Sequence, residues 1–359
     1  MKNVCFFSGD ITRSGGTERV STMIANGLAA CGKYHILFLS LTEQGERPFF
    51  PLAEGIEHFA LGERWINPGP GYLKVIPKLR RFLREKGIDI VIDIDIVLDV
   101  LSIPASRGLK VRIISWEHFD FAYEMGSLYR RLILKYSVKR TDYVVTLTKE
   151  NQKRYGEEAG RKRNIATIYN PIQELPPDRP VEKEKWLITV GHLTRVKGTD
   201  YLGQVASIVL KRNPDWKWMV LGDGEEMGYL RAVTEKESLE GRLILTGRQK
   251  EVNSYLEKSQ IYVMTSRSEG LPMCLLEAKA FRLPSVSFDI PGANEIIRDG
   301  INGYLVRAFD CQAMAHKLEW LMKEETQRQQ LAQNAWSDLA RFRLENILEQ
   351  WIQVLDSQN

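Results

Sequence analysis

Short apolar runs alternate with amphipathic segments along the whole chain. Residues 4–8 form an apolar run of strand length, and residues 20–31 then place apolar side chains at helical spacing on one face. The same alternation continues through the first half, with strands predicted at 34–41, 88–96, 111–116 and 143–147 and helices at 73–86 and 128–139. Repeated strand–helix units of this kind form parallel sheets that helices cover on both faces.

A second cycle of the same pattern begins near the middle of the chain. Residues 174–185 are rich in proline and charge, which indicates a linker. Strands are then predicted at 186–190, 218–221, 243–246, 261–265 and 285–288, each followed by a helical segment. Two such series predict an α/β protein with two Rossmann-like domains, 1–170 and 171–343, whose parallel sheets face a central cleft. The last segment, 344–359, has a helical pattern and is expected to pack back on the first domain.

Composition narrows the class of protein. The chain has 359 residues, of which 43% are hydrophobic and 27% charged, enough to build two cores. It contains no run of about 18 apolar residues, and its first residues do not have the pattern of a secretory signal. Four cysteines are scattered without a CxxC pair, which indicates reduced thiols and argues against a zinc site. These features predict a cytoplasmic protein.

The sharpest local signal follows the strand predicted at 261–265. Glu269 lies in the loop after that strand, Pro272 is placed as the first helical residue, and Glu277 lies about a turn and a half inside the helix. A helix start of this kind suits an anion such as phosphate. The backbone N–H groups expected to face such a ligand are those around Gly270, Leu271, Pro272 and Met273. The two carboxylates can accept hydrogen bonds from sugar hydroxyls. The spacing of Glu269 and Glu277 alone would favour an interpretation of both as ordinary surface residues.

The surroundings of this motif resemble a known family. The motif, its continuation at 278–287 and the segment 295–306 are similar to the family 4 retaining glycosyltransferases, which have the GT-B architecture. Segments 15–19, 169–171 and 191–198 match as well, so the resemblance spans nearly the whole chain. It implies a hexosyltransferase that moves a sugar from a nucleotide diphosphate sugar to a glycan or lipid-linked saccharide acceptor, with retention at the anomeric carbon.

The resemblance also implies a context and two residue roles. The expected context is cell-surface polysaccharide synthesis, with uridine as the expected base and no cofactor or bound metal. By motif position, Glu269 contacts the donor sugar and Glu277 contacts the ribose.

A second matching segment, 191–198, follows the strand predicted at 186–190. In the family, an arginine and a lysine here neutralise the leaving diphosphate, and Lys197 matches the lysine. His192 stands at the arginine position, so the second cation is either His192 itself or Arg195 three residues later. A lysine at a helix start can hold a diphosphate as a point charge.

Four further residues complete the expected site. Gly16 belongs to a glycine pair at the first strand-to-helix turn, and the resemblance implies a backbone contact there to the diphosphate or the acceptor. His118 directly follows the strand predicted at 111–116, and the family has a histidine there that contacts the donor sugar. The backbone near Gly247 and Arg248 is expected beside the nucleotide base by resemblance.

Two motifs carry less weight. Asp93 and Asp95 form a DxD sequence, the metal motif of the other glycosyltransferase fold, but it lies within a predicted strand and is discounted. Arg282 stands where the family usually has glycine, at a helix C-terminus that favours left-handed backbone, so strain of about 1 kcal/mol is expected there.

The charge is unevenly distributed. The net charge is +4, with an excess of roughly +7 in residues 1–170. Basic residues accompany apolar ones in helical segments 73–86 and 128–140, which predicts contact with an anionic membrane surface at its cytoplasmic face or, equally, two ordinary surface helices. No nucleic-acid motif accompanies this charge.

Two other functions remain open from the sequence. One is a nucleotide-sugar 2-epimerase of similar fold, and the other is a protein that binds a nucleotide sugar without turning it over. A nicotinamide dehydrogenase is disfavoured because the glycine pair at 15–16 does not extend to GxGxxG.

Overall fold

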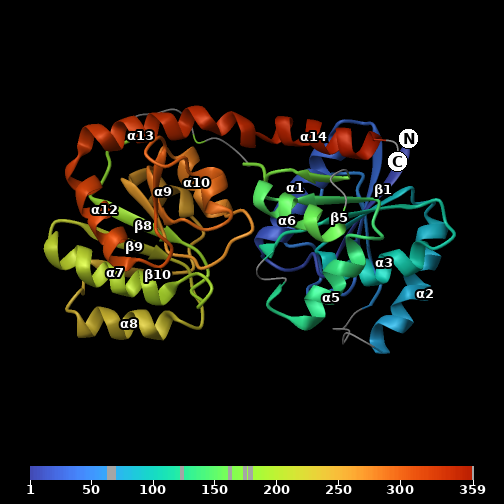
Figure 1. Ribbon diagram of the computed structural model, residues 1–359, viewed down its shortest axis with the longest axis horizontal. Coiled ribbons are helices and arrows are strands. Elements are labelled where there is room, and N and C mark those ends of the chain that lie inside the picture. The colour runs from blue at the N-terminus through green and yellow to red at the C-terminus, as the bar shows by residue number, and fades with distance from the viewer. Residues whose placement is uncertain (63–69, 122–124, 161–163, 173–175, 177–180, 358–359) are drawn as a thin grey trace. The chain divides into compact units, whose positions relative to one another are not determined.

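The structure is a computed structural model that describes residues 1–62, 70–121, 125–160, 164–172, 176 and 181–357. It divides into two compact units (Figure 1). Unit 1 comprises Met1–Gln173 and Phe342–Asn359, and unit 2 comprises Glu174–Arg341. From the sequence, the boundaries between the two domains were predicted after residues 170 and 343.

Unit 1 is built on a sheet of seven parallel strands in the order β3-β2-β1-β4-β5-β6-β7. The central strands are almost fully buried apolar runs, as parallel strands covered on both faces must be. The strand bounds are β1 Lys2–Ser8, β2 Tyr34–Ser40, β3 Glu57–Ala60, β4 Ile90–Ile94, β5 Arg112–Trp116, β6 Tyr143–Thr146 and β7 Ile165–Thr167.

The helices of unit 1 cover this sheet (Figure 1). They are α1 Gly16–Ala30, α2 Pro70–Glu85, α3 Asp99–Ser106, α5 Leu128–Ser137 and α6 Lys149–Ala159, with a 3₁₀ turn at Ile96–Leu98. The α2 and α3 helices share one core cluster with β1, β2 and β4, which includes Phe7, Leu79 and Leu101.

The C-terminal helix α14, Leu344–Asp356, packs on unit 1. Trp351 of α14 lies edge-on to Trp116 at the end of β5, with ring centroids 4.7 Å apart. The Arg112 guanidinium donates to the carbonyl oxygens of Val354 and Ser357 at 2.8 and 2.9 Å. These contacts hold the chain's last helix against the first sheet.

Unit 2 has a six-stranded parallel sheet in the order β10-β9-β8-β11-β12-β13. Its strands are β8 Trp186–Val190, β9 Lys217–Leu221, β10 Leu243–Gly247, β11 Ile261–Met264, β12 Ser285–Phe288 and β13 Gly303–Val306. Its helices are α7 Thr199–Arg212, α8 Met227–Lys236, α9 Val252–Lys258, α10 Met273–Ala280, α11 Ala293–Ile296, α12 Cys311–Lys323 and α13 Glu325–Ser337, followed by a 3₁₀ turn at Asp338–Phe342.

The two sheets confirm the predicted α/β class with two Rossmann-like domains. The structure adds three short strands that the sequence did not predict, β3, β7 and β13. Arg282 has the predicted left-handed backbone, with φ 56°, and its guanidinium lies 4.4 Å from the Trp336 ring centroid. Within the described ranges, no helix is both long enough and apolar enough to cross a bilayer.

Candidate active site

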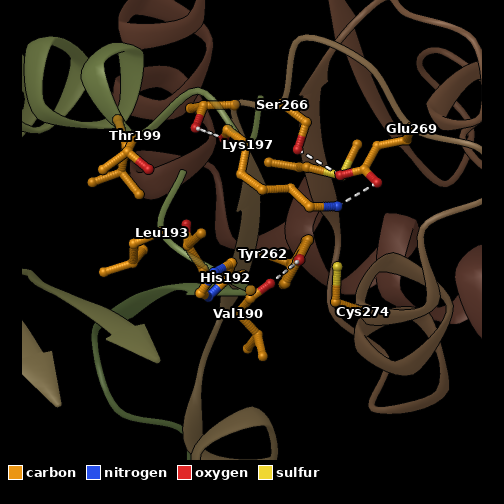
Figure 2. A pocket seen from close by; sticks show the side chains of 14 residues that line it. Val190, His192, Leu193, Lys197, Thr199, Tyr262, Ser266, Glu269 and Cys274 are labelled. Atoms are coloured by element: carbon orange, nitrogen blue, oxygen red, sulfur yellow. Dashed lines mark hydrogen bonds and ion pairs between the residues drawn. The ribbon is translucent and has the colours of Figure 1, made fainter. Parts of the chain in front are cut away.

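A pocket lies in unit 2 at the point where the strand order reverses. The β8 and β11 strands are neighbours there, although the chain runs outward from them in opposite directions. Ligands of open α/β sheets bind at the carboxyl ends of the strands beside such a switch point. The pocket has an empty volume of about 390 Å³ and is walled by residues 189–193, Lys197, the start of α7, the end of β11 with its following loop, and α10 (Figure 2).

Glycines make the close packing of the pocket loops possible. Gly198 has φ 65°, and a Cβ there would lie 1.8 Å from the carbonyl oxygen of Thr265. Gly222, at the end of β9, has φ 142°, and a Cβ there would lie 1.8 Å from the carbonyl oxygen of Gly191. Any side chain at either position would therefore push the 191–198 loop away from the strands that support it.

Two predicted site residues meet in this pocket. The Lys197 ammonium donates to Glu269 Oε2 at 2.6 Å, and the Ser266 hydroxyl donates to Glu269 Oε1 at 2.6 Å (Figure 2). The Glu269 side chain is 7% exposed, whereas that of Lys197 is 37% exposed. Burial alone would lower the pKa of Lys197, but the Glu269 carboxylate raises it above its ordinary value. Lys197 therefore stays protonated and places a positive charge in the pocket wall.

A tyrosine and a cysteine lie behind this ion pair. The hydroxyl of Tyr262 faces Cys274, and burial raises the pKa of the Cys274 thiol to about 11. The thiol is therefore neutral at physiological pH. Tyr262, Ser266 and Cys274 all line the pocket, yet the sequence assigned none of them a role in the site. A hydroxyl side chain placed just after the end of an apolar strand is a sequence feature that could have indicated Ser266.

The structure separates the two candidates for the second cation. His192 lines the pocket with Lys197. Arg195 is outside the pocket lining, with a side chain that is 64% exposed and an Nη1 atom 2.8 Å from Asp200 Oδ2. Asp200 also accepts two hydrogen bonds from Arg267, at 2.6 and 2.7 Å. Arg195 thus already has a carboxylate partner at the start of α7.

The loop before α10 differs in one detail from the prediction. Pro272 is the N-cap, with ψ 110°, so the helix begins at Met273, one residue later than predicted. Leu271 is buried. Gly292 packs closely against Gly270, because a Cβ on Gly292 would lie 2.7 Å from the Gly270 carbonyl oxygen. Glu277 lies on α10, where its charge acts on Cys274.

The remaining unit 2 candidates lie at the end of β10. Gly247 ends this strand with φ 69°, and Arg248 follows it as an exposed residue. Neither lines the pocket.

His118 lies in unit 1, directly after β5. It is 7% exposed, and its ring packs on Trp116 with centroids 4.5 Å apart. Burial lowers its pKa to about 3, so the imidazole is neutral at physiological pH. Among the described residues, Nε2 has no hydrogen-bond partner. The neighbouring Glu117 fixes the backbone by accepting from the Phe119 amide at 2.8 Å.

Gly16 is the first residue of α1, but an acidic side chain already lies at this helix start. A Cβ on Gly15 would come within 2.1 Å of Glu18 Oε2, so the Glu18 carboxylate folds back over the N-terminal turn. Burial raises the pKa of Glu18, although hydrogen bonds from backbone amides oppose that shift. An anionic ligand at Gly16 would have to displace this carboxylate.

The DxD aspartates have protein partners. Asp93 Oδ1 accepts from the Ser102 hydroxyl at 2.6 Å, and Asp95 pairs with Arg130 at 3.2 Å. In the part of the chain that the structure describes, no group of three or more His, Cys, Asp or Glu side chains is arranged to hold a metal.

Comparison with known proteins identifies the family. Residues 14–174 match the family model described as Glycosyltransferase Family 4, and residues 172–338 match the model described as Glycosyl transferases group 1. An uncharacterized glycosyltransferase of Haemophilus influenzae is 33% identical over 357 residues, covering 99% of this chain and 100% of the relative. The chain belongs to glycosyltransferase family 4. The predicted enzyme class, a hexosyltransferase with the GT-B architecture, is thereby confirmed.

Other relatives of this family 4 glycosyltransferase have more specific names. The amylovoran biosynthesis glycosyltransferase AmsD of Erwinia amylovora is 28% identical, over 96% of this chain and 97% of the relative. An N-acetylgalactosaminyltransferase of Campylobacter jejuni, named for a diphosphate-undecaprenol acceptor, is 27% identical over 95% of each chain. Among solved structures, Anabaena HepE in complex with UDP aligns over 100% of both chains, with a TM-score of 0.83 and 18% identity.

Proposed function

We propose that this glycosyltransferase transfers a hexose from a UDP-sugar, with retention at the anomeric carbon, to a saccharide or lipid-linked acceptor in cell-surface polysaccharide assembly. The observation that carries the proposal is the Lys197–Glu269 pair at the switch point of unit 2, in a pocket whose wall also holds His192. The names of AmsD and the Campylobacter enzyme support the class of acceptor. The UDP bound to HepE supports the class of donor.

The residues of the pocket suit a reaction in which negative charge develops on a leaving group. The bond between the anomeric carbon and the diphosphate oxygen breaks, and Lys197 and His192 stabilise the departing diphosphate. The acceptor oxygen forms its bond on the same face of the sugar, and its proton passes to the departing phosphate. No protein nucleophile and no metal ion is needed in this scheme.

The carboxylates and the buried histidine have positioning roles in this scheme. Glu269 accepts hydrogen bonds from donor-sugar hydroxyls, and Glu277 accepts them from the ribose. His118, being neutral, offers an uncharged ring nitrogen to the sugar. Each role is an assignment by motif position, and each is open to test by substitution.

The experiment that tests the function is a panel of nucleotide sugars scored for release of the nucleoside diphosphate. Each donor is incubated with and without saccharide and undecaprenyl-diphosphate-linked acceptors. Acceptor-dependent release of UDP from one donor is the expected result, and NMR of the product should show the anomeric configuration of the donor. Conversion of the donor to its C2 epimer without any acceptor, and with no net release of the nucleoside diphosphate, would instead identify a 2-epimerase.

We also propose that unit 1 contacts an anionic membrane at the cytoplasmic face. Large apolar side chains are exposed at the starts of α2 and α5, where Leu73, Leu128 and Leu132 are 71%, 74% and 60% exposed. Tyr72 of α2 faces Tyr129 of α5, so these residues gather on one part of the unit. Lys74 and Arg131 lie beside them and are exposed, and apolar side chains flanked by basic ones suit a surface of anionic lipid.

Several basic residues of the same helices are engaged elsewhere. Arg130 pairs with Asp95, Arg81 pairs with Glu85, and Arg80 donates to the carbonyl oxygen of Ala105 at 2.9 Å. The membrane proposal therefore rests on the exposed apolar residues and the basic side chains next to them, not on a uniformly basic helix.

Vesicle sedimentation tests this contact. Binding to vesicles with phosphatidylglycerol, weakened by salt, is expected for the wild type, and the triple variant Leu73→Ser, Leu128→Ser, Leu132→Ser should lose it. Ile301→Ser, at an exposed apolar position in unit 2, is the matched control. Equal binding by the triple variant and the control would contradict the proposal.

A further inference from the structure

We infer that Ser266 is a positioning residue that fixes the Glu269 carboxylate, so that one carboxylate serves both Lys197 and the donor sugar. The inference deepens the proposed function and rests on it. Ser266 is 3% exposed, and its hydroxyl donates to Glu269 Oε1 at 2.6 Å from the loop that directly follows β11. Nothing in the motif of two glutamates assigns a role to this serine.

The two oxygens of Glu269 have different protein partners. Oε1 accepts from Ser266 and Oε2 accepts from Lys197, each at 2.6 Å (Figure 2). A carboxylate held at both oxygens cannot rotate about its terminal bond without breaking one of these contacts. Ser266 therefore determines the plane of the carboxylate, and through it the direction in which Lys197 is held.

The arrangement keeps hydrogen-bonding capacity free for a ligand. Each carboxylate oxygen can accept about two hydrogen bonds and an ammonium group can donate three, so the two contacts use only part of the capacity of Glu269 and Lys197. Lys197 can thus donate to a diphosphate while it keeps Glu269, and Glu269 can accept from a sugar hydroxyl while it keeps Lys197. Binding of the donor then requires no rearrangement of the ion pair.

The adjacent hydroxyl shows that this role is specific to position 266. Thr265 precedes Ser266 and is also buried, but its hydroxyl donates to the carbonyl oxygen of Gly198 at 3.0 Å. Thr265 therefore holds the backbone of the 191–198 loop, whereas Ser266 holds a side chain. The two neighbouring hydroxyls fix the two parts of the pocket that a donor would contact.

Ser266→Ala tests the inference, with Ser287→Ala as the matched control. Ser287 is a fully buried serine of the neighbouring strand β12, and its hydroxyl donates to the carbonyl oxygen of Phe288 at 2.9 Å. A small misplacement of a reacting group costs up to about 100-fold in rate, so we expect kcat of Ser266→Ala to fall about 10- to 100-fold. The KM for the donor should change less than about twofold, because the binding contacts of the nucleotide remain.

A crystal structure of unliganded Ser266→Ala gives a readout that does not depend on turnover. We expect the Glu269 carboxylate to rotate and its contact with Lys197 to lengthen, while in Ser287→Ala both contacts remain. An unmoved Glu269–Lys197 pair in Ser266→Ala, or a kcat equal to that of the control, would overturn the inference. Failure of the wild type to transfer sugar with any donor would overturn the proposed function, while the structural comparison would still decide the role of Ser266.

Discussion

The two units surround some of their carboxyl groups differently. In unit 2, the buried Glu269 lies against Lys197, the buried Asp200 lies against Arg267, and the partly buried Asp338 lies against Lys279. In unit 1, the fully buried Asp93 and Asp99 face each other and burial raises the pKa of both, while burial also keeps His118 neutral. Unit 2 therefore holds these carboxylates as ion pairs, whereas unit 1 holds two carboxyl groups against each other and a neutral imidazole.

This difference matches the parts of the substrate that each unit is proposed to bind. A buried ion pair is not strong evidence for stability, because desolvation of both ions offsets their attraction. A cation kept charged by a carboxylate is instead ready for a diphosphate. A neutral imidazole suits an uncharged sugar hydroxyl. The following predictions test this division, from the largest expected effect to the smallest.

Removal of the charge at position 197 should have the largest effect. Lys197→Ala is expected to reduce kcat/KM for transfer by about 1000-fold, because the developing charge on the diphosphate loses a cation in a pocket of low polarity. Lys211→Ala is the matched control, since Lys211 pairs with Glu237 on the surface of unit 2. Steady-state kinetics measure both variants. A loss of less than about tenfold in Lys197→Ala would show that unit 2 does not supply the essential cation.

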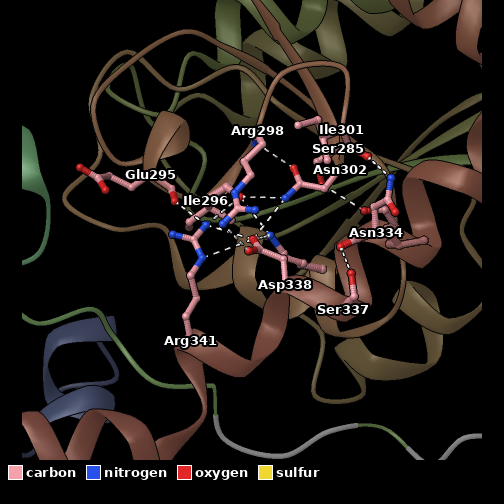
Figure 3. Close-up of polar contacts among 12 residues, drawn as sticks. Ser285, Glu295, Ile296, Arg298, Ile301, Asn302, Asn334, Ser337, Asp338 and Arg341 are labelled. Atoms are coloured by element: carbon pink, nitrogen blue, oxygen red, sulfur yellow. Dashed lines mark hydrogen bonds and ion pairs between the residues drawn. The ribbon is translucent and has the colours of Figure 1, made fainter.

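A second prediction concerns the structural ion cluster of unit 2. Asp338 accepts from Lys279, Arg298 and Arg341, and Lys279 is 3% exposed (Figure 3). Asp338→Ala removes the shared acceptor from these cations and should lower the free energy of unfolding by about 3–5 kcal/mol. Arg298→Ala, whose side chain is 58% exposed, should cost less than about 1 kcal/mol.

Urea denaturation followed by tryptophan fluorescence distinguishes these two variants. If Asp338→Ala and Arg298→Ala had equal effects, the cluster would behave as a set of surface pairs. The charges of unit 2 would then be ordinary surface features instead of part of its interior.

The aspartate pair of unit 1 predicts a dependence of stability on pH. Burial raises the pKa of Asp93 to about 7, so the native state holds a proton that the unfolded chain releases near pH 4. The stability from this proton is present in full below about pH 4 and is lost as the pH rises through about 7. Asp99→Asn removes one carboxyl and should stabilise unit 1 by on the order of 1–3 kcal/mol at pH 8.5, with little gain at pH 4.

Thermal unfolding at pH 4, 6 and 8.5 measures this effect. The exposed carboxylate variant Glu240→Gln is the control, and its difference from the wild type should not change with pH. A stability difference for Asp99→Asn that is the same at all three pH values would contradict a shared proton in unit 1.

The smallest expected change is at His118, where no titration is predicted. Its pKa near 3 means that the imidazole stays neutral between pH 5 and 8, so its ¹⁵N signals should not move in that range. The ring ¹⁵N signals of His118 are identified as those that are missing from the spectrum of the His118→Asn variant. Movement of these signals by the large amount that protonation of the ring causes, with a midpoint between pH 5 and 8, would contradict a neutral His118.

The sequence predicted the interior strands of both sheets and the edge strand β10, but it missed the other three edge strands, β3, β7 and β13. The buried strand β11 is a continuous apolar run and β4 is apolar except for Asp93, which the pattern reveals directly. The missed β3 is four residues long and partly exposed, and β7 has only three residues. Edge strands of this kind are determined by pairing with a neighbour, as in the contact of Leu37 with Glu57, and local pattern does not record that pairing.

Local motifs named candidate residues, whereas the contacts between those residues are long-range. Lys197 and Glu269 are 72 residues apart, and the resemblance named both as candidates for the site. Sequence left His192 and Arg195 as alternatives, and it could not show that Arg195 pairs with Asp200, because that contact exists only in the folded chain. It also could not show that Ser266 reaches Glu269, since the loop geometry decides which hydroxyl bonds a side chain and which bonds the backbone.

We propose that the Lys197–Glu269 pocket of unit 2 binds the diphosphate of the donor. A crystal structure with UDP bound tests it most directly. We predict diphosphate oxygens within about 3.2 Å of Lys197 Nζ, with His192 beside them and Arg195 still on Asp200. A diphosphate held away from Lys197, or a Lys197 that remains bound to Glu269 alone, would contradict the account.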